Sequence, residues 1–429
     1  MFPIRLTVGL AAAWMAIPGW AQTDQALSSS VLLARALENN RELLAARQRV
    51  EEARGLLQQA GVRPAPTLEA TGTTGRPLAT VGEEQFGVGI AQIFETAGKR
   101  SKRMHLAEKQ LALAEAEYDE RVRQLRFEVR FRFAEYATEA ERLQIVERLL
   151  GAYQRSLDLV RARVAQGDAA ALERDLLLVE VSRSEAQRAA ILGRMEAARV
   201  ELARLVGLGD PQAIATPLIE PLPVIHFDLG QLKSKSLTER PDLRAAEIIR
   251  QQGEAESLLA QAQGKADVTL SAGYTRVFSR FDDQLGLTPA GVPATLRDRD
   301  DVLSIGVSIP LFGRDRNLGN IEAAIARTRG AQYRREFLER SIPLEVEVAW
   351  RRFTSAREAF QTLNEKVLRQ AEKNLEVIQR AYQLGQLRLL DVLNEQRRLL
   401  DTQLAVVDSK LEVLRGLAEL ERASGGELQ

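Results

Sequence analysis

The sequence predicts a mainly α-helical chain with a small β part: three chains would contribute four strands each to a 12-stranded barrel, which continues into a long helical coiled coil. Three observations predict this fold. Apolar residues recur at steps of three and four over very long stretches, short alternating segments occur in pairs, and the whole pattern occurs twice. The 429 residues therefore form two copies of one unit rather than unrelated domains.

Residues 1–21 have the features of a cleavable secretory signal peptide. Arg5 precedes an apolar stretch, which ends at Pro18, and Ala21 provides a small residue at the cleavage site. An N-terminal membrane anchor is the alternative, but about 12 apolar residues fall short of the roughly 20 that a spanning helix needs. The sequence therefore predicts that the chain is exported.

The overall composition excludes several classes of protein. Lys and Arg number 59 against 59 Asp and Glu, so the net charge of zero does not indicate a nucleic-acid partner. The absence of Cys excludes disulfides, thiolate metal sites and a lipid-modified cysteine. No later segment approaches 18 consecutive apolar residues, which argues against an inner-membrane helical protein.

An internal repeat organises the chain. Residues 37–43 align with 237–243, and Gly167 in a predicted turn aligns with Gly385 at a larger offset. The extra residues of the second copy fall between 274 and 302, where we expect an expanded loop. Internal duplication of this kind indicates two copies of one supersecondary unit.

Each unit is expected to contain a helix, two strands, a long helix, a turn and a shorter helix. The first repeat spans 22–206, and the second repeat with its C-terminal tail spans 236–429. The segment 207–235 between them contains four prolines within a short stretch, which predicts a linker.

Four segments alternate apolar with small or polar residues, the period-2 pattern of a strand. They lie at 67–74, 86–91, 268–274 and 303–311. Four strands cannot close a barrel, and an open edge leaves backbone groups unsatisfied in lipid. Three copies would give 12 strands, enough for a barrel with a lumen. A soluble two-hairpin sheet packed on the helices is the alternative.

A helix of unusual length follows the first predicted hairpin. Apolar residues continue at coiled-coil spacing from Val122 to Val164, so the helix should run from about Gly98 to Ala165. At about 1.5 Å per residue it would be roughly 100 Å long and must project from the membrane. The second unit has a similar stripe, and Pro343 should bend its helix.

Two motifs at the predicted hairpin turns correspond to each other. Tyr382-Gln383-Leu384-Gly385 is followed by Leu390-Asp391-Val392-Leu393, and Val164-Ala165-Gln166-Gly167 is followed by Leu172-Glu173. Together with the signal, the repeat and the paired strands, they give a chain that resembles the TolC-like outer-membrane factors of Gram-negative efflux and secretion systems. The resemblance covers nearly the whole mature chain.

The strand-to-helix junctions resemble one branch of this family. Glu95 with Gly98-Lys99-Arg100, and the second-copy segment 310–317, are similar to the CzcC-like branch, which serves heavy-metal resistance pumps. These junctions do not touch substrate, so the cargo of the chain stays open.

The family resemblance implies a homotrimer in the cell outer membrane, surrounded by lipid, with its helices extending into the periplasm. It implies two further partners, a periplasmic adaptor protein and an inner-membrane pump of the RND type. The chain would then be the passive outer-membrane channel of a tripartite efflux system that exports heavy-metal cations. A drug-efflux channel and a type I secretion channel are the alternatives within the family.

The resemblance also implies a periplasmic gate. Tyr382 matches the tyrosine that latches the closed end, and Glu173 matches its acidic partner. Asp391 matches one acid of the carboxylate ring at the entrance. The second acid falls at Asn394, a departure that implies a weaker ring or one completed by Glu395.

Physical reasoning allows two interpretations of the gate residues. Threefold symmetry would bring three copies of Asp391 near one axis, where they would attract cations. Alternatively, Asp391 caps the helix after the turn, where a negative charge is favourable. Tyr382 could likewise only fill the coiled-coil seam.

The two turns are the expected docking tips for the adaptor. They comprise Gln166 and Gly167 in the first repeat and Leu384 and Gly385 in the second. Each glycine should adopt the left-handed conformation that reverses the chain.

Other functions have little support in the sequence. His105 and His226 are far apart, no set of residues has metal-ligand spacing, and we predict no metal site and no cofactor. No nucleophile elbow or phosphate loop is present, so we predict no catalytic residues and no enzyme. A periplasmic structural coiled-coil protein is the remaining rival, but it does not explain two alternating hairpins at matched places in a repeat.

Overall fold

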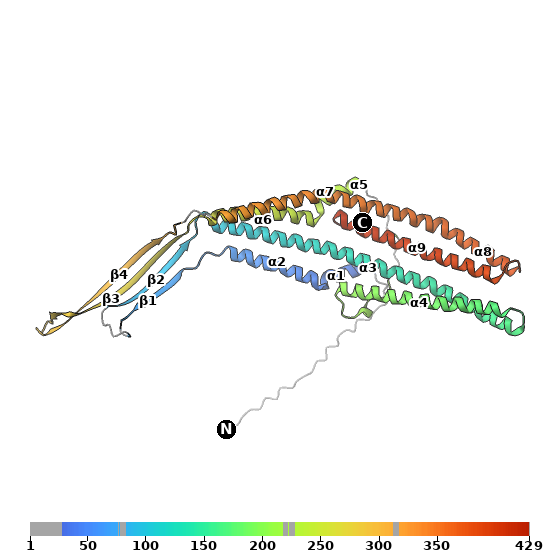
Figure 1. Ribbon diagram of the computed structural model, residues 1–429, viewed down its shortest axis with the longest axis horizontal. Helices are drawn as coiled ribbons and strands as arrows, with labels where there is room; N and C mark the ends of the chain where they lie inside the picture. The colour runs from blue at the N-terminus through green and yellow to red at the C-terminus, as the bar shows by residue number, and fades with distance from the viewer. Residues whose placement is uncertain are drawn as a thin grey trace, which may run out of the picture.

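The computed structural model of the chain describes residues 28–75, 77, 83–217, 222, 228–311 and 317–428. The molecule is elongated, with a four-stranded sheet at one end and the turns of two helical hairpins at the other (Figure 1). The signal peptide expected at residues 1–21 lies outside the described residues.

The elements follow one order twice along the chain. The first half contains α1 (Ser29–Asn39), α2 (Arg41–Ala60), β1 (Thr67–Thr73), β2 (Glu83–Phe94), α3 (Lys99–Gln166), α4 (Ala171–Val206) and the short helix η2 (Pro211–Ala213). The second half contains α5 (Leu229–Glu239), α6 (Pro241–Gln263), β3 (Val268–Leu287), β4 (Pro293–Ser308), α7 (Leu318–Thr362), η3 (Leu363–Leu368), α8 (Arg369–Gln383) and α9 (Leu389–Ser424). This is the expected unit, except that its first helix is two helices.

The break in the first helix has the same geometry in both halves. Asn40 and Arg240 each adopt an extended conformation, with ψ of 119° and 121°. Asn40 accepts a hydrogen bond from the Leu43 N–H and donates one to the Leu205 carbonyl, at 2.9 and 2.8 Å. Arg240 donates to the Ala423 carbonyl at 3.4 Å. Each buried polar residue therefore ties its break to the C-terminal end of the hairpin helix in its own half.

The four strands form one antiparallel sheet in the order β1-β2-β3-β4, as the alternating segments predict. The register places most of the large apolar side chains of the four strands on one face, and they are exposed in the single chain: Leu68, Phe86, Val88, Ile90, Leu270, Leu303, Ile305 and Val307. The other face carries mainly Thr, Ser and Gly, with Ile93, Val277 and Val302 among them. An apolar face of this size indicates contact with lipid rather than water.

The prediction of an expanded loop between residues 274 and 302 is wrong. β3 continues to Leu287 and β4 begins at Pro293, so the extra residues lengthen a hairpin. The turn is closed by the Thr288 N–H bound to the Val292 carbonyl at 3.0 Å, with Gly291 at a φ of +76°. A run of five charged residues, 297–301, hides the outer part of β4 from a search for apolar alternation.

The long helix α3 begins and ends within one residue of the predicted span and has 68 residues. It packs against α1, α2 and α4. Near the middle of α3, Leu125, Val129 and Phe133 belong to a core that also contains Leu32 and Leu202. The apolar stripe predicted for a coiled-coil seam is therefore the buried face of α3.

The second long helix is interrupted. Pro343 lies inside α7, as predicted, and the six-residue π-helix η3 separates α7 from α8. The linker expected at 207–235 is also shorter than predicted, because α5 begins at Leu229. Its N-cap Asp228 binds the Gly230 N–H at 2.9 Å and starts the helix there.

Ion pairs and hydrogen bonds fix the sheet to the helices. The Arg103 guanidinium binds the Glu95 carboxylate at 2.6 Å, and Lys99 binds Asp267 at 2.8 Å. Arg100 Nε donates to the Gly61 carbonyl at 2.6 Å. None of the helices in the described part of the chain combines the length and the apolar character that a membrane crossing requires.

Candidate functional site

The candidate site is the pair of hairpin tips at the end of the molecule opposite the sheet (Figure 1). One tip joins α3 to α4 at Gly167, and the other joins α8 to α9 near Gly385. Both glycines have positive φ, +83° and +74°, so the predicted left-handed conformations are confirmed.

The two turns share one hydrogen-bond pattern. In the first tip the Asp168 N–H binds the Arg163 carbonyl at 2.8 Å, and in the second the Gln386 N–H binds the Ala381 carbonyl at 2.9 Å. This Schellman arrangement satisfies the last carbonyl groups of each helix. It leaves the expected docking residues Gln166, Gly167, Leu384 and Gly385 exposed at the apex of the tips.

Beneath the tips, residues from three helices form a shared core. It consists of Leu150, Tyr153, Leu157 and Val160 of α3, Leu177 and Val181 of α4, and Leu389 and Leu393 of α9. Tyr382 of α8 is partly buried against this core, which is the seam-filling arrangement. Glu173 is half-buried in the first turn of α4. No hydrogen bond joins Tyr382 to Glu173 among the described residues of this single chain.

The three expected ring residues lie on α9 but differ in environment. Asp391 is exposed, and its Oδ2 accepts the Arg388 N–H at 3.0 Å, so this carboxylate caps the helix. Asn394 is exposed one turn later. Glu395 is only 8% exposed and accepts a hydrogen bond from Arg398 at 3.3 Å.

Sequence reasoning missed an ion pair just behind the tip, in which the acidic partner is buried. Arg397 Nε on α9 donates to the Glu180 carboxylate on α4 at 2.8 Å, and the Glu180 side chain is 3% exposed. The bond raises the pKa of Arg397. This pair connects the helical hairpin of one repeat to that of the other.

Tyr153 lies beside this ion pair and is 1% exposed. Its hydroxyl has no hydrogen-bond partner in the described part of the chain. Burial and the neighbouring Glu180 carboxylate raise the pKa of Tyr153 to about 12. The only signal in the sequence was a glutamate on the apolar stripe of α4, since Arg397 lies 217 positions away.

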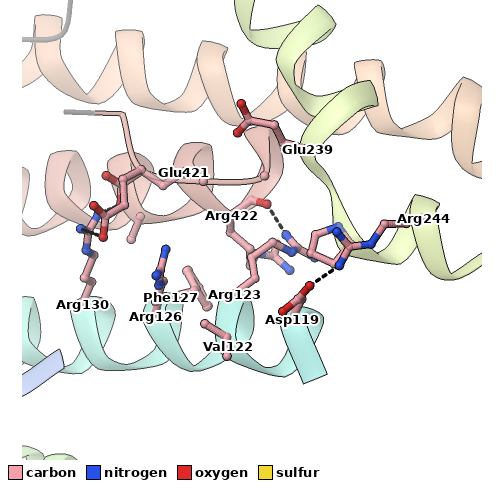
Figure 2. A pocket seen from close by; sticks show the side chains of 15 residues that line it. Asp119, Val122, Arg123, Arg126, Phe127, Arg130, Glu239, Arg244, Glu421 and Arg422 are labelled. Carbon is pink, nitrogen blue, oxygen red and sulfur yellow. Dashed lines mark hydrogen bonds and ion pairs between the residues drawn. The ribbon is translucent and has the colours of Figure 1, made fainter. Parts of the chain in front are cut away.

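A pocket of about 260 Å³ lies farther from the tips, between α3, the start of α6 and the end of α9 (Figure 2). Arg244 binds Asp119 and Arg130 binds Glu421 across it. Arg422 stacks over the Phe127 ring at 5.0 Å. These contacts join α3 of the first repeat to α6 and α9 of the second, so the residues around the pocket connect the two repeats.

Within the described residues, no group of three or more His, Asp or Glu side chains is arranged to hold a metal ion. His105 is a half-exposed surface residue, 3.5 Å from Glu108. His226 lies outside the described residues.

Comparisons with known proteins agree with this architecture. Cobalt-zinc-cadmium resistance protein CzcC of Cupriavidus metallidurans is 26% identical over 402 residues, covering 93% of this chain and 90% of that protein. Solvent efflux pump outer membrane protein SrpC of Pseudomonas putida is 25% identical over 419 residues, covering 92% and 84%. The crystal structure of CusC has the same fold, with a TM-score of 0.74 at 20% identity and coverage of 93% and 92%.

The family model for outer membrane efflux proteins matches two segments, residues 32–208 and 232–426. The segments correspond closely to the two halves of the structure and span most of the chain. The chain therefore belongs to the outer membrane efflux protein family, and it is located in the cell outer membrane with its helical part in the periplasm.

Proposed function

We propose that three copies of this chain form the passive outer-membrane channel of a tripartite efflux system. The observation that carries the proposal is the four-stranded sheet, which has exposed apolar side chains on one face and two open edges, β1 and β4. An open edge is not tolerated in lipid, because its N–H and C=O groups find no partner there.

Pairing β4 of one copy with β1 of the next removes both edges. Three copies then give a closed barrel of 12 strands, within the size range of outer-membrane barrels and wide enough for a lumen. The apolar face would contact lipid, and the face of Thr, Ser and Gly would line the passage.

The exposed tips suit contact with a partner protein. Leu384 is 74% exposed at the apex of the second tip, where an apolar side chain gains by burial in an interface. We assign the tips Gln166–Gly167 and Leu384–Gly385 to docking of a periplasmic adaptor, which links the channel to an RND-type pump of the inner membrane.

We place the gate next to these tips, on the side toward the sheet. Three copies of the exposed Asp391 near the threefold axis would form the carboxylate ring, and Asn394 lies about one turn farther along α9. Glu395 is buried within its own chain, so it would stabilise the ring helix rather than line the opening. Tyr382 and Glu173 would form the latch between neighbouring copies.

The proposed cargo is heavy-metal cations, which rests on the similarity to CzcC over nearly the whole chain. The similarity to SrpC at 25% identity favours organic solvents as the second candidate. Deleting the gene should sensitise cells to zinc, cobalt, cadmium or copper more than to hydrophobic compounds. The opposite ranking would assign the channel to solvent or drug efflux.

The assembly itself is tested by the mass of the detergent-extracted protein. We expect a trimer that migrates as one species until it is heated, recovered from the outer-membrane fraction. A stable monomer inserted in lipid would contradict the channel, and recovery in the soluble periplasmic extract would indicate a structural coiled coil instead.

A further inference from the structure

The extended β3–β4 hairpin separates its charges between the two faces of the sheet. Beyond the apolar band, β4 reads Arg297-Asp298-Arg299-Asp300-Asp301. Because side chains alternate across a strand, Arg297 and Arg299 share the face of Leu303 and Ile305, while Asp298 and Asp300 share the face of Ser304.

The partner strand adds to the same positive face. The register pairs Arg280 with Arg297, Phe278 with Arg299, and Arg276 with Asp301, all on the apolar side. We call these four arginines, Arg276, Arg280, Arg297 and Arg299, the arginine patch.

Two acidic groups lie near the patch among the side chains that the structure describes on this face. Asp301 binds Arg276 at 2.7 Å and lies 3.7 Å from Arg299. Glu84 of β2 lies on the same face opposite Phe278 and accepts a hydrogen bond from Thr74 at 3.2 Å. Arg297 and Arg299 are exposed, so they carry the part of the patch that is open to a ligand.

The patch lies at the outer boundary of the membrane. The helices leave the sheet at its opposite end, so the hairpin turn points away from the periplasm (Figure 1). Leu303 and Tyr274 form one rung of the apolar band, and the next rung toward the hairpin turn places Phe86 beside Arg276. The aromatic side chains at this level correspond to the interfacial girdle of membrane barrels. Along β4, Arg299 and Arg297 lie roughly 13 and 20 Å from Leu303 toward the hairpin turn, at about 3.3 Å per residue.

We propose that the arginine patch binds the phosphate groups of the phosphorylated glycolipid that forms the outer leaflet of the outer membrane. The inference rests on the proposed barrel, which turns the apolar face toward lipid. The occupant must place its acyl chains against the apolar band and its anionic group immediately beyond it. A phosphorylated lipid has both parts in this order.

The chemistry of the side chains fits this ligand. A guanidinium donates two parallel hydrogen bonds to one phosphate, in a geometry that an ammonium cannot offer. Arg280 and Arg297 are directly opposite each other, so one phosphate can lie within reach of both guanidinium groups. Asp298 and Asp300 of β4 face the other way and would repel anions from the lumen.

The test uses the full-length channel in detergent and native mass spectrometry with two probes, purified lipid A and enzymatically dephosphorylated lipid A. We expect the phosphorylated form to bind at least tenfold more tightly. The double variant Arg297→Gln/Arg299→Gln should lower that affinity at least tenfold and bind the two forms equally. Higher salt should weaken binding of the phosphorylated form to the wild type.

The matched control is Asp298→Asn/Asp300→Asn, which removes two charges from the same strand on the opposite face. It should bind phosphorylated lipid A as tightly as the wild type or more tightly. Equal affinity of the wild type for the two lipids, or an arginine variant that binds like the wild type, would overturn the proposal. Oligomeric state is read in the same spectra: a wild-type monomer contradicts the channel, whereas a trimer without phosphate preference contradicts only the lipid site.

Discussion

The long helices of the two repeats occupy equivalent places but differ in continuity and burial. In the first repeat α3 is one helix of 68 residues, whereas its counterpart is divided into α7, the π-helix η3 and α8. Leu157 and Val160 near the first tip are buried. Their counterparts Leu375 and Ile378, at the offset that aligns Gly167 with Gly385, are only partly buried, and α8 has no buried residue.

The same amphipathic pattern can therefore form contacts within a chain in one repeat and leave a surface for contacts between chains in the other. The tip half of α3 finds its partners, α4 and α9, within the chain. α8 has a similar apolar stripe but packs against fewer helices of its own chain. Val377 of α8 is 65% exposed. We infer that the remaining surface of α8 is available to a neighbouring chain, while α3 with α4 provides the rigid part of the tip.

The largest effect is expected at the ion pair that connects the repeats. Arg397→Leu leaves the buried Glu180 carboxylate without its partner, so the free energy of unfolding of the tip region should fall by about 3–5 kcal/mol. The midpoint of urea unfolding, followed by the helical circular dichroism signal, measures this loss.

The matched control lies on α8. Arg380 and Glu376 also form an ion pair, but their side chains are 74% and 61% exposed. Arg380→Leu should therefore change the free energy of unfolding by less than about 0.5 kcal/mol. Equal effects of the two variants would remove the distinction between a rigid first tip and a loosely packed α8.

The next effect compares equivalent leucines. Leu157→Ala removes a side chain from the core beneath the tips and should cost about 2–5 kcal/mol. Leu375→Ala should cost less than half as much in monomeric protein, because Leu375 is already partly exposed. If α8 meets a neighbouring chain, Leu375→Ala should weaken the trimer more than it weakens the monomer. Equal losses in the monomer would show that α8 is as well packed as α3.

A smaller effect is expected from alkaline pH. The Tyr153 hydroxyl has a pKa of about 12 in the folded chain against 10.0 for an exposed tyrosine. Below pH 10 both states keep the proton. Between pH 10 and 12 only the folded state keeps it, so the free energy of unfolding falls as pH rises, by at most about 2.7 kcal/mol. This part of the alkaline loss should be absent in Tyr153→Phe, and identical profiles of the two proteins would contradict the burial of that hydroxyl.

The smallest expected effect on stability concerns the two turns. A Cβ added at Gly167 or Gly385 meets no heavy atom within 4 Å apart from its chain neighbours, so the main cost of substitution there is backbone strain. Gly385→Val should cost about 1–2 kcal/mol at its positive φ. It should also weaken crosslinking to the adaptor while the trimer persists.

Two variants serve as controls for this turn. Gly385→Asn tolerates the left-handed conformation and should crosslink nearly as well as the wild type. Gly167→Val applies the same strain to the first tip and shows whether both tips dock. Unchanged crosslinking and efflux in Gly385→Val would contradict docking at the second tip.

Much of the local structure of this protein follows from the sequence alone. Period-2 alternation located all four strands, although it missed the outer parts of β3 and β4, the three-and-four spacing placed α3 to within one residue, and Gly167 and Gly385 marked the turns. These signals survive without a structure, because each depends on the chain within a few residues of itself.

Which distant residues meet depends on how the helices and strands pack together. Glu180 and Arg397 form their ion pair because α4 packs against α9, and no pattern in either helix specifies the other. The burial of Glu395 likewise depends on how α9 lies in the bundle. The arginine patch needed the strand register, since a shift by one residue would exchange its charges between the two faces.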